Sequence, residues 1–209
     1  QPVAGRVGGF GGVAGLVEWL DAERVTHLVD ATHPFAAQMS ANAVSAATLA
    51  GVPHIALSRP GWIEEDGDRW SRVVNVAGAV AALAGPRRNV MLAIGRMHVA
   101  AFAAQPQHRY LLRFVDTPSE PVALRDYRLV VDRGPFTVAG DAALLRENAI
   151  DLIVCKDAGG AGAQAKLIAA RSVGVPVVMI DRPWLPERTE VHDVAAVLAW
   201  IGHAADRGV

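Results

Sequence analysis

The sequence predicts an α/β protein built from parallel sheets that helices cover on both faces. Along the 209 residues, short apolar runs alternate with segments of helical spacing, and this alternation is typical of parallel sheets wrapped by helices. Several runs are continuously apolar, as strands buried on both faces are. The hydrophobic fraction of 52% is enough for a full core and excludes a disordered chain.

Seven apolar runs are expected to form strands, at residues 27–31, 54–57, 90–95, 110–115, 128–132, 151–155 and 176–180. The segments between and around them have helical spacing, near residues 13–24, 35–50, 77–84, 97–104, 138–148, 163–173 and 192–204. In the last of these, apolar side chains recur at positions i, i+3, i+4 and i+7, which marks one face of a helix. They are Val194, Val197, Leu198 and Ile201.

The length allows one large or two small domains. A turn-like break at residues 84–88 separates a helix from the strand at 90–95. We therefore expect domains at residues 1–88 and 89–209, both Rossmann-like or flavodoxin-like, with a cleft between them. The chain reaches its first glycine cluster at Gly8 without a preceding strand. A strand–turn–helix unit normally opens such a domain, so we expect either that the fold differs or that this unit is missing from the chain.

Composition excludes several classes of protein. A net charge of −1 argues against a nucleic-acid or membrane-surface partner. A single cysteine rules out an internal disulfide and a thiolate metal cluster, and it favours the reducing cytoplasm. The histidines show no metal-ligand spacing, so no metal site is expected. Polar residues interrupt the stretch from Ala31 to Ser58, which excludes a membrane helix there, and we expect no signal peptide.

The residues that follow the expected strands carry the chemistry, because parallel sheets bind ligands at the carboxyl ends of their strands. Of six such corners, one holds His33 and five hold a fixed cation. One arginine at a strand end is more often a surface residue, but five indicate an anion-binding edge, suited to phosphates or to a substrate with many carboxylates. We expect the corners to converge on one shared edge. The cations are Arg59, Arg96, Arg133, Lys156 and Arg182.

Both lysines of the chain lie close together, at Lys156 and Lys166. Lys156 opens a glycine-rich loop, residues 156–162, that is either a ligand cradle or only a flexible turn. Because an ammonium is a compact donor that arginine does not replace, we assign a function to Lys156. For Lys166 the functional and structural interpretations both stay open.

Other residues also carry two interpretations. His33 precedes Pro34, and it either donates a proton or a hydrogen bond to a ligand or caps a helix. Asp30 either orients the Thr32–His33 loop or merely ends a strand. Trp62 either forms the wall of a flat aromatic ligand's site or packs in the core.

Taken together, these motifs resemble the precorrin-6A reductase (precorrin-6x reductase) family of cobalamin biosynthesis. The block from Asp30 to Ser40 is the specific part, and the order and spacing of the motifs fit over nearly the whole chain. The resemblance rests on residues 8–12, 30–40, 59–62, 94–96, 133–136, 156–160 with Lys166, and 182–183.

The resemblance implies an NADPH-dependent oxidoreductase acting on a CH–CH group. It would reduce one macrocycle double bond of precorrin-6A, its tetrapyrrole partner, to give precorrin-6B. The resemblance leaves open whether the protein is a monomer and whether it contacts neighbouring pathway enzymes. Two alternatives remain: a non-catalytic sensor or carrier of an anionic tetrapyrrole or nucleotide, and an NADPH reductase of a small dicarboxylate.

With this reaction in view, we assign the site residues as hypotheses. His33 is the candidate catalytic residue, and the proton that accompanies the hydride comes either from His33 or from solvent. The candidate cofactor-binding residues are Gly95, Arg96, Gly134, Lys156, Asp157, Gly159, Gly160 and Lys166. The candidate substrate-binding residues are Thr32, His33, Phe35, Arg59, Trp62, Arg133 and Arg182.

Overall fold

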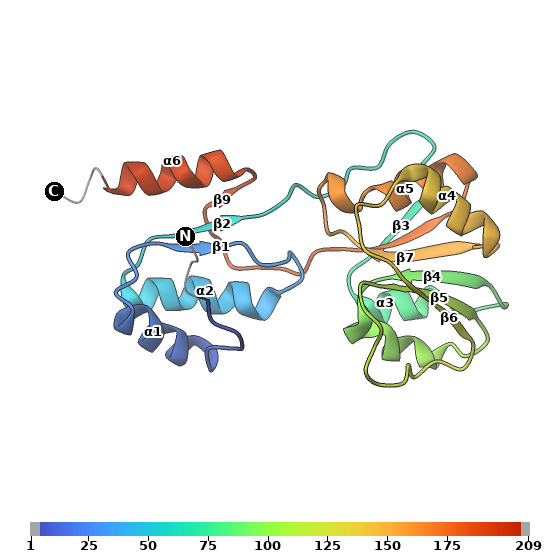
Figure 1. Ribbon diagram of the computed structural model, residues 1–209, viewed down its shortest axis with the longest axis horizontal. Coiled ribbons are helices and arrows are strands. Elements are labelled where there is room, and N and C mark those ends of the chain that lie inside the picture. The colour runs from blue at the N-terminus through green and yellow to red at the C-terminus, as the bar shows by residue number, and fades with distance from the viewer. Residues whose placement is uncertain (1–4, 206–209) are drawn as a thin grey trace. The chain divides into compact units, whose positions relative to one another are not determined.

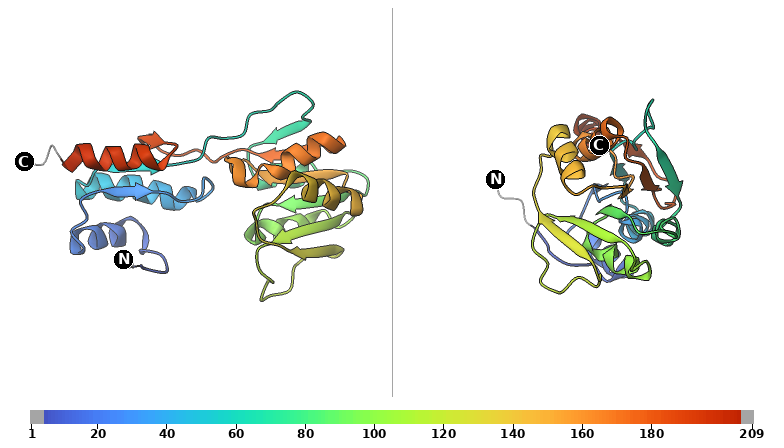
Figure 2. Two further views of the ribbon diagram at one scale, coloured as in Figure 1. Left: turned by 45° about the horizontal axis from the view of Figure 1, so that its top comes forward. Right: turned by 90° about the vertical axis from the view of Figure 1, so that its right-hand side faces the viewer.

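The computed structural model describes residues 5–205, which fold into two compact α/β units (Figures 1 and 2). Unit 1 is discontinuous in sequence and combines Gln1–Arg59 with Trp184–Val209. Unit 2 is the uninterrupted segment Pro60–Pro183.

Unit 1 contains a three-stranded parallel sheet with the order β1-β2-β9. Helices α1 and α2 pack against each other around Leu16, Leu20 and Ala46, and Figure 1 shows them on one side of the sheet with α6 on the other. The strands are β1 (Leu28–Asp30), β2 (His54–Leu57) and β9 (Glu190–Val191). The helices are α1 (Gly12–Ala22), α2 (Ala37–Ala50) and α6 (Val194–Ala205).

Unit 2 contains a six-stranded, all-parallel sheet with the order β3-β8-β7-β4-β5-β6. Its central strands read as continuous apolar runs because helices cover both faces, and Ile153, Val154 and Met179 are fully buried. The strands are β3 (Trp70–Val73), β4 (Asn89–Ala93), β5 (Arg109–Phe114), β6 (Tyr127–Val131), β7 (Leu152–Lys156) and β8 (Val177–Ile180).

The helices of unit 2 divide between the two faces of its sheet. α4 packs on α5 and α3 packs on η1, and Figure 1 shows α4 and α5 on the opposite face from α3. These helices are α3 (Val76–Ala81), the 3₁₀ helix η1 (Arg96–Ala104), α4 (Val138–Glu147), the short 3₁₀ turn η2 (Ala161–Ala163) and α5 (Ala165–Val173).

The path of the chain through this sheet reverses once. From β4 the chain steps outward to β5 and β6, and it then returns to β7 on the other side of β4. In open parallel sheets this reversal creates a crevice outside the carboxyl ends of the two strands concerned. The carboxyl ends of β4 and β7 therefore mark the position in unit 2 where a ligand is expected.

The sequence located all seven of its expected strands but missed β3 and β9. β3 reads Trp-Ser-Arg-Val and lies at the sheet edge, so it has no continuous apolar run. β9 has only two residues, too few to show a period. The segment expected as a helix at 97–104 forms a 3₁₀ helix.

The two compact units differ from the division expected at residue 88. β3 lies before that break, yet it pairs in parallel with β8, in register from Trp70↔Val177 to Val73↔Ile180. β9 and α6 lie after it, yet β9 pairs with β2 through Ala56↔Glu190. Periodicity reports the type of an element and not its pairing partner, so a turn-like break was a poor guide to the boundary.

Candidate functional site

In unit 1, the carboxyl ends of β1, β2 and β9 share one edge, where a pocket of about 470 Å³ opens. It brings together three residues that the sequence singled out, Thr32, His33 and Arg59. Phe35 lies beside them, with its ring centroid 5.9 Å from that of His33. Residues that the strand-end argument selected thus lie together at this edge, and their role as a site stays a prediction.

Asp30 orients the loop that carries Thr32, as one of its two interpretations stated. Its Oδ1 accepts hydrogen bonds from the backbone N–H of Thr32 at 3.0 Å and from the Thr32 hydroxyl at 2.7 Å. Its Oδ2 accepts one from Arg188 at 3.0 Å. Burial by itself raises the pKa of Asp30, but hydrogen bonds from Ser40 and Thr32 and the charge of Arg188 outweigh it, so the pKa lies below its ordinary value. Asp30 is therefore an ionised anchor beneath the pocket.

The structure separates the interpretations of His33. Helix α2 begins later, with Ala36 as its N-cap, so His33 is not the cap residue. The backbone N–H of Phe35 donates to Nδ1 of His33 at 3.2 Å. A ring nitrogen that accepts a hydrogen bond carries no proton, so the proton of the neutral ring lies on Nε2. This geometry favours hydrogen-bond donation from Nε2 over transfer of a proton.

Sequence reasoning missed His192, which lines the same pocket. Its Nδ1 lies 2.8 Å from the carbonyl oxygen of Ser58. The residue follows the two-residue strand β9, which periodicity did not detect. The sequence held one signal for the end of this connection, because Asp before a helical period is the usual N-cap pattern. In the structure, Asp193 does accept a hydrogen bond from the N–H of Ala196.

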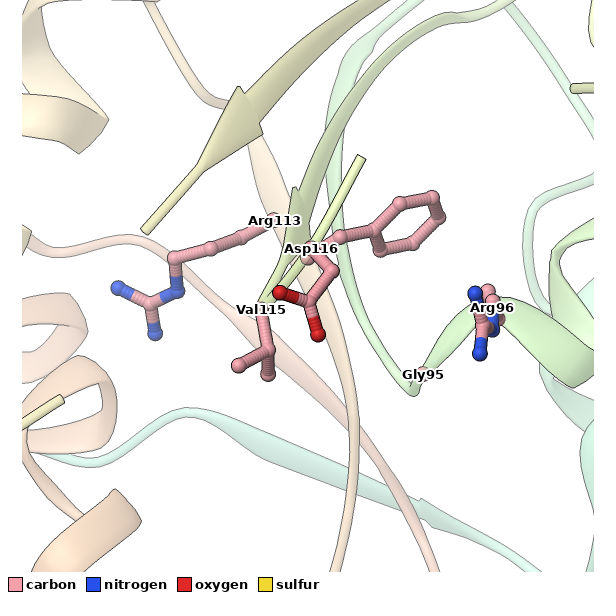
Figure 3. A pocket seen from close by; sticks show the side chains of 6 residues that line it. Gly95, Arg96, Arg113, Val115 and Asp116 are labelled. Atoms are coloured by element: carbon pink, nitrogen blue, oxygen red, sulfur yellow. The ribbon is translucent and has the colours of Figure 1, made fainter. Parts of the chain in front are cut away.

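In unit 2, Gly95 and Arg96 follow β4 and line a pocket of about 340 Å³ with Arg113 and Asp116, which come from the end of β5 and the loop after it (Figure 3). Lys156 ends β7, the strand next to β4 at which the chain path reverses. The charge of Lys156 also helps to lower the pKa of His98, after burial as the larger cause, which places this lysine near η1. Two cations thus flank the crevice that topology predicts.

Arg133 and Gly134 lie in the loop that follows β6. The Arg133 guanidinium pairs with Asp116 and donates to the carbonyl of Val115 at 3.2 Å. Both members of the ion pair are well exposed. Arg133 therefore lies beside the same pocket, in a pair that solvent weakens.

Hydrogen bonds to Asp157 hold the loop after Lys156 in place. The Asp157 carboxylate accepts from the backbone N–H of Trp62 and from Arg72, both at 3.0 Å. Arg182 donates to the Asp157 carbonyl at 3.0 Å. Gly159 has a φ of +67°, and a Cβ there would lie 2.2 Å from the carbonyl oxygen of Pro60. The loop is thus a fixed turn that only glycine fits at this position.

Trp62 and Lys166 also help to hold the loop after Lys156 in place. The Trp62 indole N–H donates to the Gly160 carbonyl at 2.9 Å, and the side chain is 7% exposed. The Lys166 ammonium lies 4.5 Å from the centroid of the Trp62 ring and donates to the Ala163 carbonyl. Burial lowers the pKa of Lys166. Both residues hold the loop from inside the unit.

A buried ion pair that the sequence did not reveal lies under the same edge. Arg113 on β5 pairs with Asp141 on α4, and both side chains are less than 9% exposed. The Arg113 guanidinium also lies 3.9 Å from the centroid of the Phe136 ring. Arginine on a strand and aspartate on a helix are common in sequences, so no local pattern pointed to this pair.

The sequence-predicted cations divide between the two sheets. Arg59 lies in unit 1, at the carboxyl edge that it shares with His33. The other four follow strands of unit 2 and share its carboxyl edge: Arg96, Arg133, Lys156 and Arg182. That all five cations converge on one shared edge stays a prediction.

Within residues 5–205, no three side chains of His, Cys, Asp or Glu gather in a way that would hold a metal ion. No helix in that range has the length and apolar character needed to span a bilayer.

Comparison with known proteins identifies the family. Residues 1–202 match the family model described as Precorrin-6x reductase CbiJ/CobK. The chain belongs to this family. The resemblance inferred from the motifs is therefore confirmed, and the precorrin-6x reductase family makes the chain an oxidoreductase.

Relatives within the precorrin-6x reductase family are close. The chain is 54% identical over 211 residues to the precorrin-6A reductase of Rhodobacter capsulatus, covering 100% of this chain and 84% of the relative. It is 48% identical to the precorrin-6A reductase of a Sinorhizobium species, covering 87% and 70%. A solved structure of CobK precorrin-6A reductase superimposes with a TM-score of 0.95 at 54% identity, covering 98% of this chain and 84% of that chain.

Proposed function

We propose that this chain reduces one double bond of the precorrin-6A macrocycle with NADPH, giving precorrin-6B as a step of cobalamin biosynthesis. The observation that carries the proposal is the 54% identity, across the whole chain, to a relative named precorrin-6A reductase. The same family membership favours an enzyme over a non-catalytic sensor or carrier. A cytoplasmic location and a cleft between the units remain predictions.

The edge of unit 2 fits the phosphates of NADPH. Gly95 has a φ of +76°, and a Cβ built on it would meet no atom within 4 Å, so its backbone faces open space. Arg96 and Lys156 follow the two strands at which the chain path reverses, and the packing of Gly159 fixes the turn after Lys156. Asp157 and Lys166 support this turn from behind, and Gly134 lies in the loop after β6. Bound NADPH supplies a hydride from its nicotinamide ring.

The edge of unit 1 fits part of a substrate that bears carboxylates. Arg59 offers a guanidinium fork, and Thr32 and the Nε2–H of His33 offer hydrogen bonds in the same pocket. Phe35 adds an aromatic ring beside them. Donors fixed before the reaction stabilise charge that develops in the transition state, and we assign this role to His33. We assign Arg133 and Arg182 to further carboxylates, and Trp62 acts by holding the Gly160 carbonyl.

The decay of NADPH absorbance in the presence of precorrin-6A tests the proposal. We expect decay with NADPH and precorrin-6A together, and a much slower decay with NADH, because only NADPH carries the 2′-phosphate that a cationic site selects. Mixtures without precorrin-6A should stay at baseline. Binding without decay would support the carrier alternative, and decay with small dicarboxylates alone would support the other reductase; either result overturns the proposal.

A further inference from the structure

Two histidines line the unit 1 pocket, and their hydrogen bonds assign the ring protons differently. In His33, Nδ1 accepts the N–H of Phe35. In His192, Nδ1 faces the carbonyl oxygen of Ser58 at 2.8 Å. A carbonyl oxygen only accepts, so Nδ1 of His192 must carry a proton. The two neutral rings therefore carry their single proton on different nitrogens.

Protonation of His33 conflicts with its surroundings. A second proton would have to go on Nδ1, where it would face the N–H of Phe35, a second donor. The contact would then be lost and two positive hydrogens would oppose each other. His33 is thus held as a neutral donor through Nε2, and it is poorly arranged to be the source of a proton.

Protonation of His192 costs no contact. Its Nδ1–H already donates to Ser58, and the second proton goes on Nε2, which no backbone N–H opposes in the described structure. The fixed Nδ1 contact also sets the plane of the ring, in the same way that an orienting acceptor sets the tautomer of other histidines. His192 is arranged to hold a proton on Nε2 and to release it.

We propose that His192 is the proton donor of the reaction and that His33 only donates a hydrogen bond. This inference rests on the proposed function. One end of the macrocycle double bond receives the hydride from NADPH, and its electron pair moves to the other end. That end takes the proton from Nε2 of His192, whose N–H bond breaks and leaves its electron pair on nitrogen. NADP⁺ and neutral His192 remain, and water reprotonates the ring.

The titratable and charged groups that line this pocket come from all three strand ends. His33 follows β1, Arg59 follows β2, and Asp193 directly follows His192 at the start of α6. The carboxylate of Asp193 is the one acidic side chain among the residues that line the pocket, and its Oδ1 accepts a hydrogen bond from the N–H of Ala196.

Turnover of a matched set of variants tests the proposal. The side-chain amide of Asn places an N–H near the position of Nδ1 but has no atom at the position of Nε2. His192→Asn therefore keeps the hydrogen bond to the Ser58 carbonyl and loses the proton that Nε2 would donate. We expect kcat to fall at least about 100-fold, the scale of general acid catalysis, with little change in NADPH affinity. His203→Asn is the control, because His203 makes the same kind of Nδ1 contact, to the Ala199 carbonyl, outside the pocket; its kcat should stay within about twofold.

Chemical rescue provides a second measurement. Added imidazole should restore turnover to His192→Ala in proportion to its concentration, because it supplies the missing acid. It should not restore turnover to His33→Ala, where the missing group is a fixed hydrogen-bond donor. Absence of rescue in His192→Ala would contradict the assignment.

Nitrogen NMR of the unliganded protein tests the basis of the argument without any turnover. At alkaline pH, where both rings are neutral, we expect the proton of His33 on Nε2 and the proton of His192 on Nδ1. The same tautomer in both rings would overturn the inference. In the kinetic test, an active wild type with an equally active His192→Asn would overturn the inference alone, whereas an inactive wild type would overturn the proposed function and the inference with it.

Discussion

Asp30 shows how a single buried carboxylate organises the unit 1 pocket. It lies at the end of β1 and is 6% exposed. It accepts two hydrogen bonds from Thr32 and one from Arg188, and Arg188 also donates to Glu190 at 3.1 Å. One carboxylate therefore ties the β1 loop to the strand β9, which arrives from the far end of the chain.

We predict that Asp30→Asn destabilises the protein by about 3 kcal/mol at neutral pH, because removing one charge of a buried pair leaves the other uncompensated. The folded pKa of Asp30 is depressed, so its contribution is complete above the unfolded pKa and is lost as the pH falls through the folded pKa. Urea unfolding at pH 7 and near pH 3 should show the difference between wild type and variant shrinking in acid. Asp21→Asn, at an exposed carboxylate, should change neither value.

His33→Ala removes the fixed Nε2 donor but leaves unit 2 untouched. We expect kcat to fall about 100-fold, the scale seen when one preorganised donor to a developing charge is lost, while NADPH affinity stays nearly constant. Absorbance decay gives kcat, and quenching of protein fluorescence gives the affinity. An unchanged kcat would show that His33 takes no part in the reaction.

Lys156→Ala should instead lower NADPH affinity, the quantity that His33→Ala leaves nearly constant. Charge-assisted hydrogen bonds contribute roughly 1.5–3 kcal/mol, so we expect NADPH affinity to fall about 10-fold or more in the same fluorescence titration. Arg146→Ala removes an exposed cation from the last turn of α4 and serves as the control. Equal affinities for these two variants would place the phosphates away from β7.

Residue types at strand ends were predictable, but their roles were not. The sequence found Thr32, His33 and Arg59 because each follows a visible strand. It did not find His192, Arg113 or Asp141, because their importance comes from partners distant in sequence. It also did not show that Trp62 and Lys166 face inward, since only the packing of β7, α5 and the loop after Pro60 determines their burial.

At the scale of elements, close packing fixes the shape of the 156–160 loop. The backbone of Gly159 passes close to Pro60 and Arg182. The backbone N–H of Trp62 donates to the Asp157 carboxylate and so joins the loop to the segment after Pro60. Such a turn presents backbone groups at a fixed position, and little reorganisation is needed when a ligand binds.

We predict that Gly159→Ala lowers both the thermal midpoint and NADPH affinity, because its Cβ would overlap the Pro60 carbonyl and its φ is unfavourable for alanine. Gly162→Ala, in the adjoining 3₁₀ turn η2, is the matched control, since a Cβ there meets nothing within 4 Å. Differential scanning fluorimetry with and without NADPH measures both effects. Equal midpoints for the two variants would contradict the packing argument.

Elements with an apolar run or a helical period were predictable from sequence. The edge strand β3 and the two-residue β9 were not, because each gains its place by pairing and not by its own pattern. The failure to see these two strands is also the reason that the domain boundary expected at residue 88 differs from the units in the structure.

At the scale of the whole molecule, the chain leaves unit 1 after Arg59, completes unit 2, and returns at Trp184. Unit 2 holds all six strands of its sheet in one continuous segment. Unit 1 needs both ends of the chain, because β9 and α6 complete it from the carboxyl-terminal side.

We predict that a fragment of residues 60–183 folds alone and unfolds cooperatively in urea, as followed by circular dichroism. A fragment of residues 89–209, cut at the boundary that the sequence suggested, lacks β3 and exposes the edge of β8. It should be less stable or should aggregate through that edge. Cooperative unfolding of the second fragment with the stability of the first would contradict the unit boundaries.

The discontinuity of unit 1 also constrains biosynthesis. A ribosome adds roughly 5–20 residues per second, so β2 waits on the order of ten seconds after its synthesis before β9 emerges to pair with it. During that interval unit 2 has time to fold completely, whereas the nascent first segment keeps an open strand edge. Chaperones that recognise unpaired strands would meet the protein at this stage, and shortening its carboxyl-terminal end would prolong the exposure indefinitely.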